Sequence, residues 1–178
     1  MTASLITAPM TQGLPTPNKG CMSEYRAQFE FECNDIEGTK DLRKYDNFCA
    51  ALANLKEIYN YEEPYDTVTL TGLVGLYEIC FEQAWKMLKE ILQVNGYAEG
   101  ASGSPRMILK TAYEAGLITD DILWLEALQE RNNVAHSYNE LIALSIVRSA
   151  KDKFYPLFVK LQQEVDKNWI GIKDPRQI

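Results

Sequence analysis

The sequence predicts an all-α protein, an up-and-down bundle of four to five helices. Apolar residues recur at three- and four-residue steps from about position 41 to about position 169, which places them on one face of each α-helix. No alternating strand pattern appears after position 40. A chain of 178 residues is long enough for one domain with a buried core. We therefore expect a helical domain over residues 39–170.

Residues 1–38 differ from the rest in composition. Pro9, Pro15 and Pro17, together with Gly13 and Gly20, leave no helical or strand period in this stretch. We expect an extension that is poorly structured or loosely docked. The polar end, residues 171–178, is expected to be a frayed tail.

The first predicted helix begins near Asp41 and carries Phe48, Leu52 and Leu55 on its apolar face. Glu63-Pro64 is expected to end it, because proline has no amide proton and disfavours a helical predecessor.

The second predicted helix begins between Asp66 and Thr69, ends at Asn95-Gly96, and is the most apolar segment of the chain. Gly72 and Gly75 lower its helix propensity, so we expect them to allow a neighbouring backbone to approach closely. A second apolar face is expected to be either core or a dimer interface. The first stripe consists of Leu70, Leu73, Val74, Tyr77, Cys80, Phe81, Ala84, Leu88, Ile91 and Leu92, and the second face of Leu76, Ile79, Trp85 and Met87.

Three more helices are expected after a small-residue loop. Ser104-Pro105 begins a short helix that ends at Gly116, with Ile108, Leu109, Ala112 and Tyr113 facing inward. Asp120-Asp121 begins the next helix, where capping explains the two acids better than a metal site does. Its expected inner face is Ile122, Leu125 and Leu128, with Trp124 close by. The last helix is expected from about Asn139 to Trp169, with a kink at Pro156.

Composition excludes several classes of function. The net charge of −7 argues against a broad basic surface for nucleic acid. The four cysteines form no CxxC pair, and with a single histidine they predict no zinc site or other metal site. The chain has neither an apolar run of transmembrane length nor a signal peptide pattern. A reduced, cytoplasmic protein with no membrane contact is expected.

The segment Arg131–Tyr138 contains the only histidine of the chain, His136. Arg131 and His136 are five residues apart, about 140° around an ideal helix, so they do not share a face of one helix. Either the helix ends between them or two copies meet across a dimer axis. Arginine beside histidine suits phosphodiester cleavage, with the guanidinium neutralising phosphate and the imidazole moving a proton. The alternative is a helix end in which both side chains satisfy carbonyls and carboxylates.

The spacing Arg-x-x-x-x-His-x-Tyr resembles the signature of HEPN domains. Five further segments make the resemblance closer, to the nucleotidyltransferase substrate-binding proteins that are related to HepT toxins, over roughly residues 40–169. The segments are Lys44-Tyr45-Asp46-Asn47-Phe48, Leu70-Thr71-Gly72-Leu73, Phe81-Glu82-Gln83-Ala84-Trp85, Gly103-Ser104-Pro105-Arg106 and Arg131-Asn132-Asn133-Val134-Ala135-His136.

This resemblance implies a homodimer in which two copies of the motif face one cleft, and a minimal nucleotidyltransferase as partner. For a HepT-like member it implies a metal-independent endoribonuclease toxin without a cofactor, with Arg131 and His136 catalytic, Asn132 as a supporting polar neighbour, and Tyr138 as a residue that the partner antitoxin adenylylates. The older family name implies the alternative, a non-catalytic subunit that presents substrate to the nucleotidyltransferase.

RNA contact requires local positive charge in such an acidic chain. Three residues near the motif are acidic, namely Glu126, Glu130 and Glu140. Arg106, Lys110 and Arg148 are the cations expected to contact phosphate or a partner if they fold toward the cleft.

Aromatic residues cluster between Tyr59 and Tyr65. They are expected to pack at a helix end, and the alternative is that they stack on bases or bind a partner.

Overall fold

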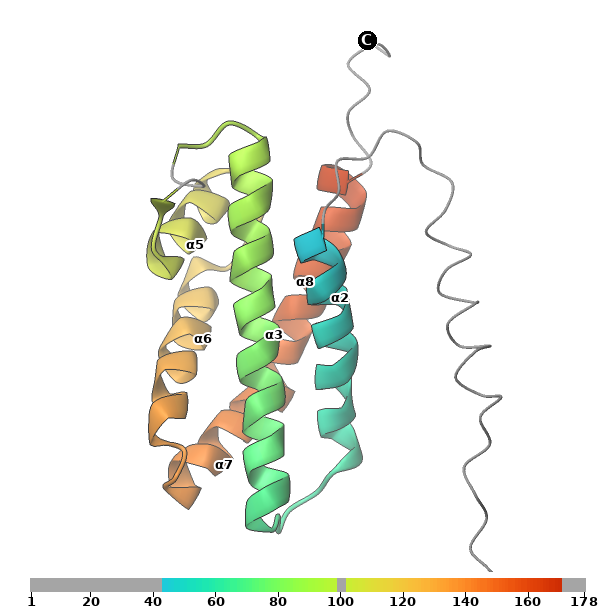
Figure 1. Ribbon diagram of the computed structural model, residues 1–178, viewed down its shortest axis with the longest axis vertical. Coiled ribbons are helices and arrows are strands. Elements are labelled where there is room, and N and C mark those ends of the chain that lie inside the picture. The colour runs from blue at the N-terminus through green and yellow to red at the C-terminus, as the bar shows by residue number, and fades with distance from the viewer. Residues whose placement is uncertain (1–42, 99–101, 171–178) are drawn as a thin grey trace, which may run out of the picture. The chain divides into compact units, whose positions relative to one another are not determined.

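The computed structural model describes residues 43–98 and 102–170 (Figure 1). These residues form helices and connections, with no strand in the described ranges, so the all-α prediction is confirmed. The predictions for 1–38 and 171–178 lie outside these residues, as do Cys21 and Cys33. The elements in order are α2 (Arg43–Lys56), η1 (Glu57–Asn60), α3 (Thr67–Val94), α5 (Pro105–Glu114), α6 (Asp121–Asn133), η2 (Val134–His136), α7 (Glu140–Ser149), η3 (Ala150–Phe154), α8 (Tyr155–Val165) and η4 (Asp166–Ile170).

Helix α3 is the centre of the bundle, with α2 and α8 on one side and α5 and α6 on the other (Figure 1). The Asp66 carboxylate caps it by accepting hydrogen bonds from the backbone N–H of Val68 and Thr69 at 2.9 and 3.0 Å. Every residue of its predicted main apolar stripe is buried. The predicted boundaries and core face of this helix are confirmed.

No neighbouring backbone in the described residues approaches Gly72 or Gly75 closely. A Cβ placed on either residue would meet no described atom within 4 Å. The expectation of close backbone approach is therefore wrong for the described part of the chain. Both glycines lie on the side of α3 that faces away from its buried stripe, where packing makes no demand on them.

Aromatic side chains fill the core between α3, α6 and the last helix. The rings of Tyr77 and Phe154 stack with their centroids 5.2 Å apart, and Trp124 meets Phe158 at 5.4 Å. The buried Tyr77 hydroxyl donates to the carbonyl oxygen of Ala127 on α6 at 2.5 Å. These contacts fix α6, and therefore the motif at its end, against α3.

The first helix ends earlier than predicted. Its α-helical part stops at Lys56 and a single 3₁₀ turn, η1, follows, so Glu63-Pro64 lies in the connection. Lys151 explains the course of this connection, because its ammonium donates to the Tyr61 carbonyl oxygen at 2.5 Å and to the Tyr65 hydroxyl at 2.9 Å. The Tyr59 ring packs edge-on against Tyr155 at 5.3 Å. The packing interpretation of these aromatics is the one that the structure supports.

Two of the predicted inward positions on α5 and α6 are wrong. Tyr113 is 45% exposed and Ile122 is 76% exposed, whereas Trp124 and Ala127 form the buried face of α6. Apolar residues occur on every side of α6, so its periodicity does not select a face. The large Trp124 ring takes the core position because it fills the space beside Phe81 and Phe158.

Asp120 caps α6, with its carboxylate accepting from the Leu123 N–H at 3.0 Å. This favours the capping interpretation of the acid pair, and no cluster of metal-binding side chains occurs among the described residues.

The last predicted helix bends at the expected place. A π-helical segment, η3, separates α7 from α8, and Pro156 lies in the first turn of α8 (Figure 1). The Tyr155 N–H bonds to the Ala150 carbonyl, five residues back, which is the wider turn of a π-helix. The apolar stripe of this helix stays buried through the bend, and it consists of Ala143, Val147, Ala150, Phe154, Leu157, Phe158, Leu161 and Val165. No helix in the described ranges combines the length and the apolarity that crossing a membrane needs.

Candidate functional site

The motif forms a corner between α6 and α7, which we call the motif corner (residues 131–138). Helix α6 ends at Asn133, η2 runs to His136, and the Asn139 N–H donates to the His136 carbonyl oxygen at 3.1 Å. The Asn139 side chain then caps α7 by accepting from the Leu141 N–H at 3.0 Å. The helix therefore ends between Arg131 and His136, as one of the two sequence alternatives predicted.

Arg131 is held by an internal carboxylate. Its Nη2 lies 2.7 Å from Glu82 Oε1 on α3, and the Arg131 and Glu82 side chains are 36% and 21% exposed. The second oxygen of Glu82 lies 3.3 Å from the Lys86 ammonium. The Nε of Arg131 is buried without a hydrogen-bond partner, so the guanidinium keeps one unused donor.

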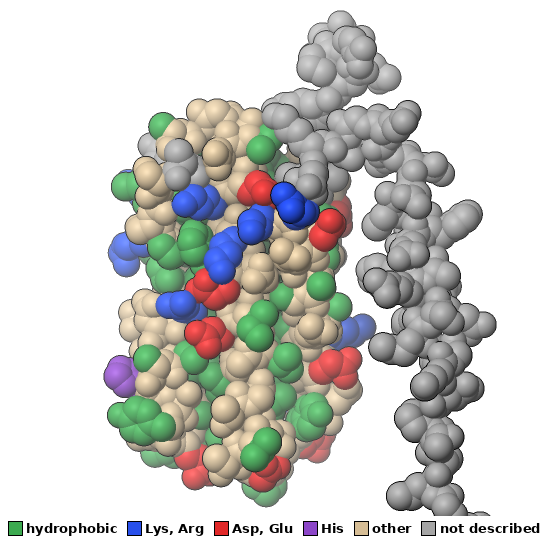
Figure 2. Space-filling view, in the orientation of Figure 1, with side chains coloured by type: hydrophobic (Ala, Val, Ile, Leu, Met, Phe, Trp, Pro, Cys, Tyr) green, Lys and Arg blue, Asp and Glu red, His purple; other side chains and the backbone are tan. Residues whose placement is uncertain are grey.

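His136 and Tyr138 are exposed side by side. Their ring centroids are 6.3 Å apart with an edge-on geometry, and Tyr138 is 88% exposed. The histidine stands at the edge of the face drawn in Figure 2. In the described part of the chain neither ring has a hydrogen-bond partner, and no hydrogen bond joins His136 to Arg131. The structure thus leaves His136 and Tyr138 open to a ligand.

The polar residues near the corner are mostly engaged with one another. Asn132 is exposed, while Asn133 donates to Glu130 at 3.4 Å. Glu126 is paired with Lys153 at 2.6 Å.

Arg148 does not turn toward the corner. Its guanidinium makes a two-pronged pair with Glu63 at 2.7 and 2.5 Å, and this pairing raises the pKa of Arg148 and lowers the pKa of Glu63. In this structure Arg148 therefore balances Glu63 rather than the acidic residues near the motif.

Arg106 and Lys110 lie at the other end of α6. They line a hollow of about 390 Å³ between α5 and α6, which we call the α5–α6 hollow. None of the motif residues is part of its lining. The lining consists of Ser104, Arg106, Met107, Leu109, Lys110, Tyr113, Asp121 and Leu125.

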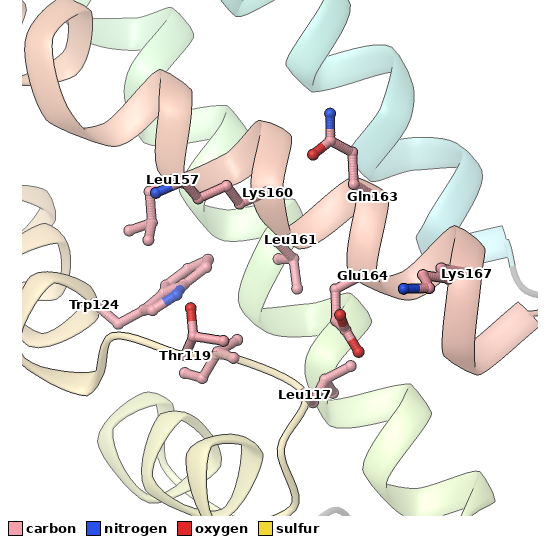
Figure 3. Close-up of a pocket in the computed structure, with 10 residues that line it drawn as sticks. Leu117, Thr119, Trp124, Leu157, Lys160, Leu161, Gln163, Glu164 and Lys167 are labelled. Carbon is pink, nitrogen blue, oxygen red and sulfur yellow. The ribbon is translucent and has the colours of Figure 1, made fainter.

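A second hollow of about 330 Å³ lies where α8 meets the α5–α6 connection (Figure 3). Trp124, Leu117 and Leu157 form its walls and are at most 5% exposed. Lys160, Glu164 and Lys167 surround it. Because its apolar walls are already covered, the hollow offers a ligand little apolar surface, and we interpret it as a seam of the fold.

The two described cysteines are not candidate nucleophiles. Burial raises the pKa of the Cys80 thiol, and partial burial raises the pKa of the Cys49 thiol. A thiol with a raised pKa holds little of the reactive thiolate near neutral pH.

Glu82 is the site residue that sequence reasoning missed. It is 49 positions from Arg131, so no local spacing links the two residues. The only signal was an acidic residue next to Phe81 in the Phe81–Trp85 stretch, which indicates a flank of the core rather than a partner for Arg131. The corner therefore presents two exposed rings and a guanidinium whose charge is paired with Glu82.

Comparisons with known proteins bear on the fold and the family of this chain. No curated protein matches the chain. A solved structure of a protein from Thermus thermophilus is 31% identical, covers 66% of this chain and 94% of its own, and superposes with a TM-score of 0.53. The HI0074 structure from Haemophilus influenzae is 23% identical, covers 69% of this chain and 99% of its own, and has a TM-score of 0.58. It is described as revealing the fold of a substrate binding domain of a nucleotidyltransferase.

A protein family also matches most of the chain. Residues 43–167, which include all of α2 to α8 and the motif corner, match the family described as "Nucleotidyltransferase substrate binding protein like". The similarity in the fold of HI0074 agrees with that match. The chain belongs to the nucleotidyltransferase substrate binding protein like family.

Proposed function

We propose that this protein is a non-catalytic subunit that binds substrate for a separate minimal nucleotidyltransferase chain. The observation that carries the proposal is the ion pair between Arg131 and Glu82 at 2.7 Å. An arginine that neutralises a scissile phosphate needs its charge available. Here an internal carboxylate already balances that charge, which favours a binding role over cleavage. The net charge of −7 supports the same choice.

The relatives support a nucleotidyltransferase as partner. HI0074 is described as a substrate binding domain of a nucleotidyltransferase, and its fold resembles that of this chain. A subunit of this kind presents a face to the catalytic chain. The exposed His136, Tyr138 and Leu141 on and beside the motif corner provide one, because Tyr138 and Leu141 are 88% and 77% exposed.

The test is co-expression with a minimal nucleotidyltransferase chain. We expect the two chains to co-elute, and the complex to transfer nucleotide at lower acceptor concentration than the catalytic chain alone. Leu141→Asp is expected to weaken the complex by about tenfold or more, since it places a charge in a buried contact. Two chains that elute separately at micromolar concentration would contradict the proposal.

A HEPN-type endoribonuclease toxin is the second candidate. It is favoured by the exposure of His136 beside Tyr138. In this hypothesis a homodimer brings two corners together, Arg131 and His136 act on RNA, Asn132 supports the motif, and the nucleotidyltransferase adenylylates Tyr138.

Metal-free RNA cleavage by the purified chain tests this candidate. Cleavage is expected to disappear in His136→Ala and Arg131→Ala, and to rise in Glu82→Gln, which releases the guanidinium. Cleavage that survives both alanine substitutions would exclude it. An adenylyl mass increment that is still present in Tyr138→Phe would exclude the modification site.

A further inference from the structure

The α5–α6 hollow is lined by two cations, Arg106 and Lys110, and by the aromatic ring of Tyr113. Arg106, Lys110 and Tyr113 are spaced i, i+4 and i+7, so they share one face of α5. Arg131 and Arg148 are paired with carboxylates, whereas Arg106 has no hydrogen-bond or ion-pair partner in the described ranges. Lys110 has only the exposed Glu114 at 3.8 Å.

The apolar part of the hollow is open to a ligand. Met107 is 51% exposed and Tyr113 is 45% exposed, while Leu125 completes the lining from α6. The volume of about 390 Å³ lies within the range of small-molecule sites, roughly 300–1,000 Å³, which are mostly apolar with a few polar groups. The seam beside Trp124 lacks this exposed apolar surface.

We propose that the α5–α6 hollow binds a nucleoside 5′-monophosphate, or a ligand with the same combination of a planar ring and one phosphomonoester. The inference rests on the proposed function, because it names the substrate class of the subunit. The Arg106 guanidinium and the Lys110 ammonium hold the phosphate. The ring packs against Tyr113 and Met107. The Asp121 carboxylate, on the α6 side, accepts hydrogen bonds from sugar hydroxyls.

Charge decides between this ligand and a more highly charged one. A phosphomonoester carries a charge of about −1.5 to −2 at neutral pH, which the two cations of α5 match. A triphosphate or an RNA strand brings more negative charge into a hollow that already contains Asp121, on a chain of net charge −7. The hollow is therefore expected to prefer the monophosphate.

The test is a calorimetric titration of AMP into the full chain, with adenosine and inorganic phosphate as separate titrants. We expect saturable binding of AMP with a Kd below about 1 mM, and each half-ligand at least about tenfold weaker. Arg106→Gln and Tyr113→Ala should each weaken AMP binding by about tenfold. Lys160→Gln is the matched control, because Lys160 is also an exposed cation without a partner in the described ranges, and lines the other hollow.

The outcomes separate the two proposals. Absent or non-saturable AMP binding would overturn the site, as would an affinity that Arg106→Gln leaves unchanged or that Lys160→Gln lowers equally. Chemical denaturation of each variant verifies that it folds, and Arg106→Lys, which keeps the charge, should restore part of the affinity. AMP binding is measured without the nucleotidyltransferase. Complex formation is measured separately, by co-elution. If the complex forms but the chain does not bind AMP, only the proposed site in the hollow is refuted. If the chain binds AMP but no complex forms, only the subunit role is refuted.

Discussion

The hydroxyl of Tyr77 joins two helices from inside the core. It donates to the Ala127 carbonyl oxygen at 2.5 Å, and the side chain is fully buried. Removing the hydroxyl leaves the carbonyl without this donor and creates a small void. We expect Tyr77→Phe to lower the free energy of unfolding by about 1–2 kcal/mol, measured by urea denaturation.

Tyr138→Phe is the matched control for Tyr77→Phe. Its hydroxyl is exposed and has no partner in the described ranges. The same chemical change there should alter stability by less than about 0.5 kcal/mol. If Tyr77→Phe and Tyr138→Phe change the free energy of unfolding equally, the buried hydrogen bond of Tyr77 does not stabilise the fold.

The Arg131–Glu82 pair should contribute modestly to stability, because both side chains keep contact with water. Glu82→Gln is expected to lower the free energy of unfolding by about 0.5–1 kcal/mol, and by less in 1 M salt. Glu114→Gln is the control, since it removes only an exposed contact of 3.8 Å with Lys110. If the free energy of unfolding that Glu82→Gln loses does not change with salt, the contribution of this pair is not electrostatic.

At the residue scale, the sequence identified the motif and where its helix ends. Single-residue spacing showed that Arg131 and His136 cannot share a helical face, and the structure ends α6 between them. The sequence did not identify Glu82 as the partner of Arg131, because a contact between distant helices depends on their packing and leaves no local pattern.

Helix α3 begins at a cap whose strength depends on pH. Hydrogen bonds from the Thr69 side chain and from the Thr69 and Val68 amides lower the pKa of Asp66 from its usual 3.8. Stability from this group is therefore present above about pH 3.8 and is lost as the pH falls through the lower, folded-state pKa. We expect Asp66→Ala to lower Tm at pH 7 by about 2–4 °C, measured by calorimetry.

The difference in Tm between Asp66→Ala and the unmodified chain should shrink below about pH 3.8. Asp66→Asn is the control, because an asparagine side chain also caps a helix but does not titrate. Its Tm should therefore stay near that of the unmodified chain at pH 7. A difference that is constant from pH 7 to pH 3 would contradict the assignment of the cap to the ionised carboxylate.

Lys151 ties the connection before α3 to the π-helical segment η3. Its ammonium reaches the Tyr61 carbonyl oxygen and the Tyr65 hydroxyl, and it lies 5.5 Å from the centre of the Tyr65 ring. We expect Lys151→Met to speed amide hydrogen exchange in residues 61–66, while the free energy of unfolding changes by less than about 1 kcal/mol. Lys153→Met, whose partner is Glu126 on α6, should leave exchange in 61–66 unchanged. Equal exchange in the two variants would contradict the proposed tie.

At the element scale, predictions were accurate where one apolar stripe dominates the pattern. Helix α3 has a dominant stripe beside its second apolar face, and clear end signals in Asp66 and Asn95, so its limits and its main core face follow from the sequence. Helix α6 is apolar on several sides, and only packing against Phe81 and Phe158 chooses Trp124 as the buried residue. The sequence therefore predicted that both α3 and α6 are helices, but it predicted the buried face only for α3.

The whole molecule leaves large apolar side chains uncovered near the motif corner. Tyr138 and Leu141 are 88% and 77% exposed. In the endoribonuclease candidate this surface instead joins two 20.3 kDa chains, and light scattering is expected to show a homodimer. Leu141→Asp should raise the dimer dissociation constant by about tenfold or more.

Val94→Asp is the control for the dimer prediction. Val94 is an exposed apolar residue at the end of α3, while the motif corner lies near the beginning of that helix (Figure 1). The substitution should leave the mass unchanged. A monomer in the unmodified chain at micromolar concentration would contradict the dimer, and with it a cleft shared by two motif corners.

At the same scale, the bundle and its family followed from the sequence, whereas the separation of the candidate residues did not. Arg106 and Lys110 were candidates for contact with phosphate or a partner if they folded toward the cleft. The structure places them beside Asp121, at the opposite end of α6 from Arg131. Which side chains come together in the folded bundle depends on how the helices pack against one another. Patterns along the sequence do not give that packing.

Glu82 contacts two cations through different oxygens, Arg131 at 2.7 Å and Lys86 at 3.3 Å. An anion that takes Arg131 therefore does not leave Glu82 without a partner, because Lys86 is one helical turn away on α3. In the endoribonuclease candidate, phosphate binding at the motif corner is then an exchange of partners among three charged groups rather than the rupture of an ion pair. The cost of freeing Arg131 is shared with Lys86, so neutralising Lys86 should make the corner less receptive to anions even though that lysine never touches them.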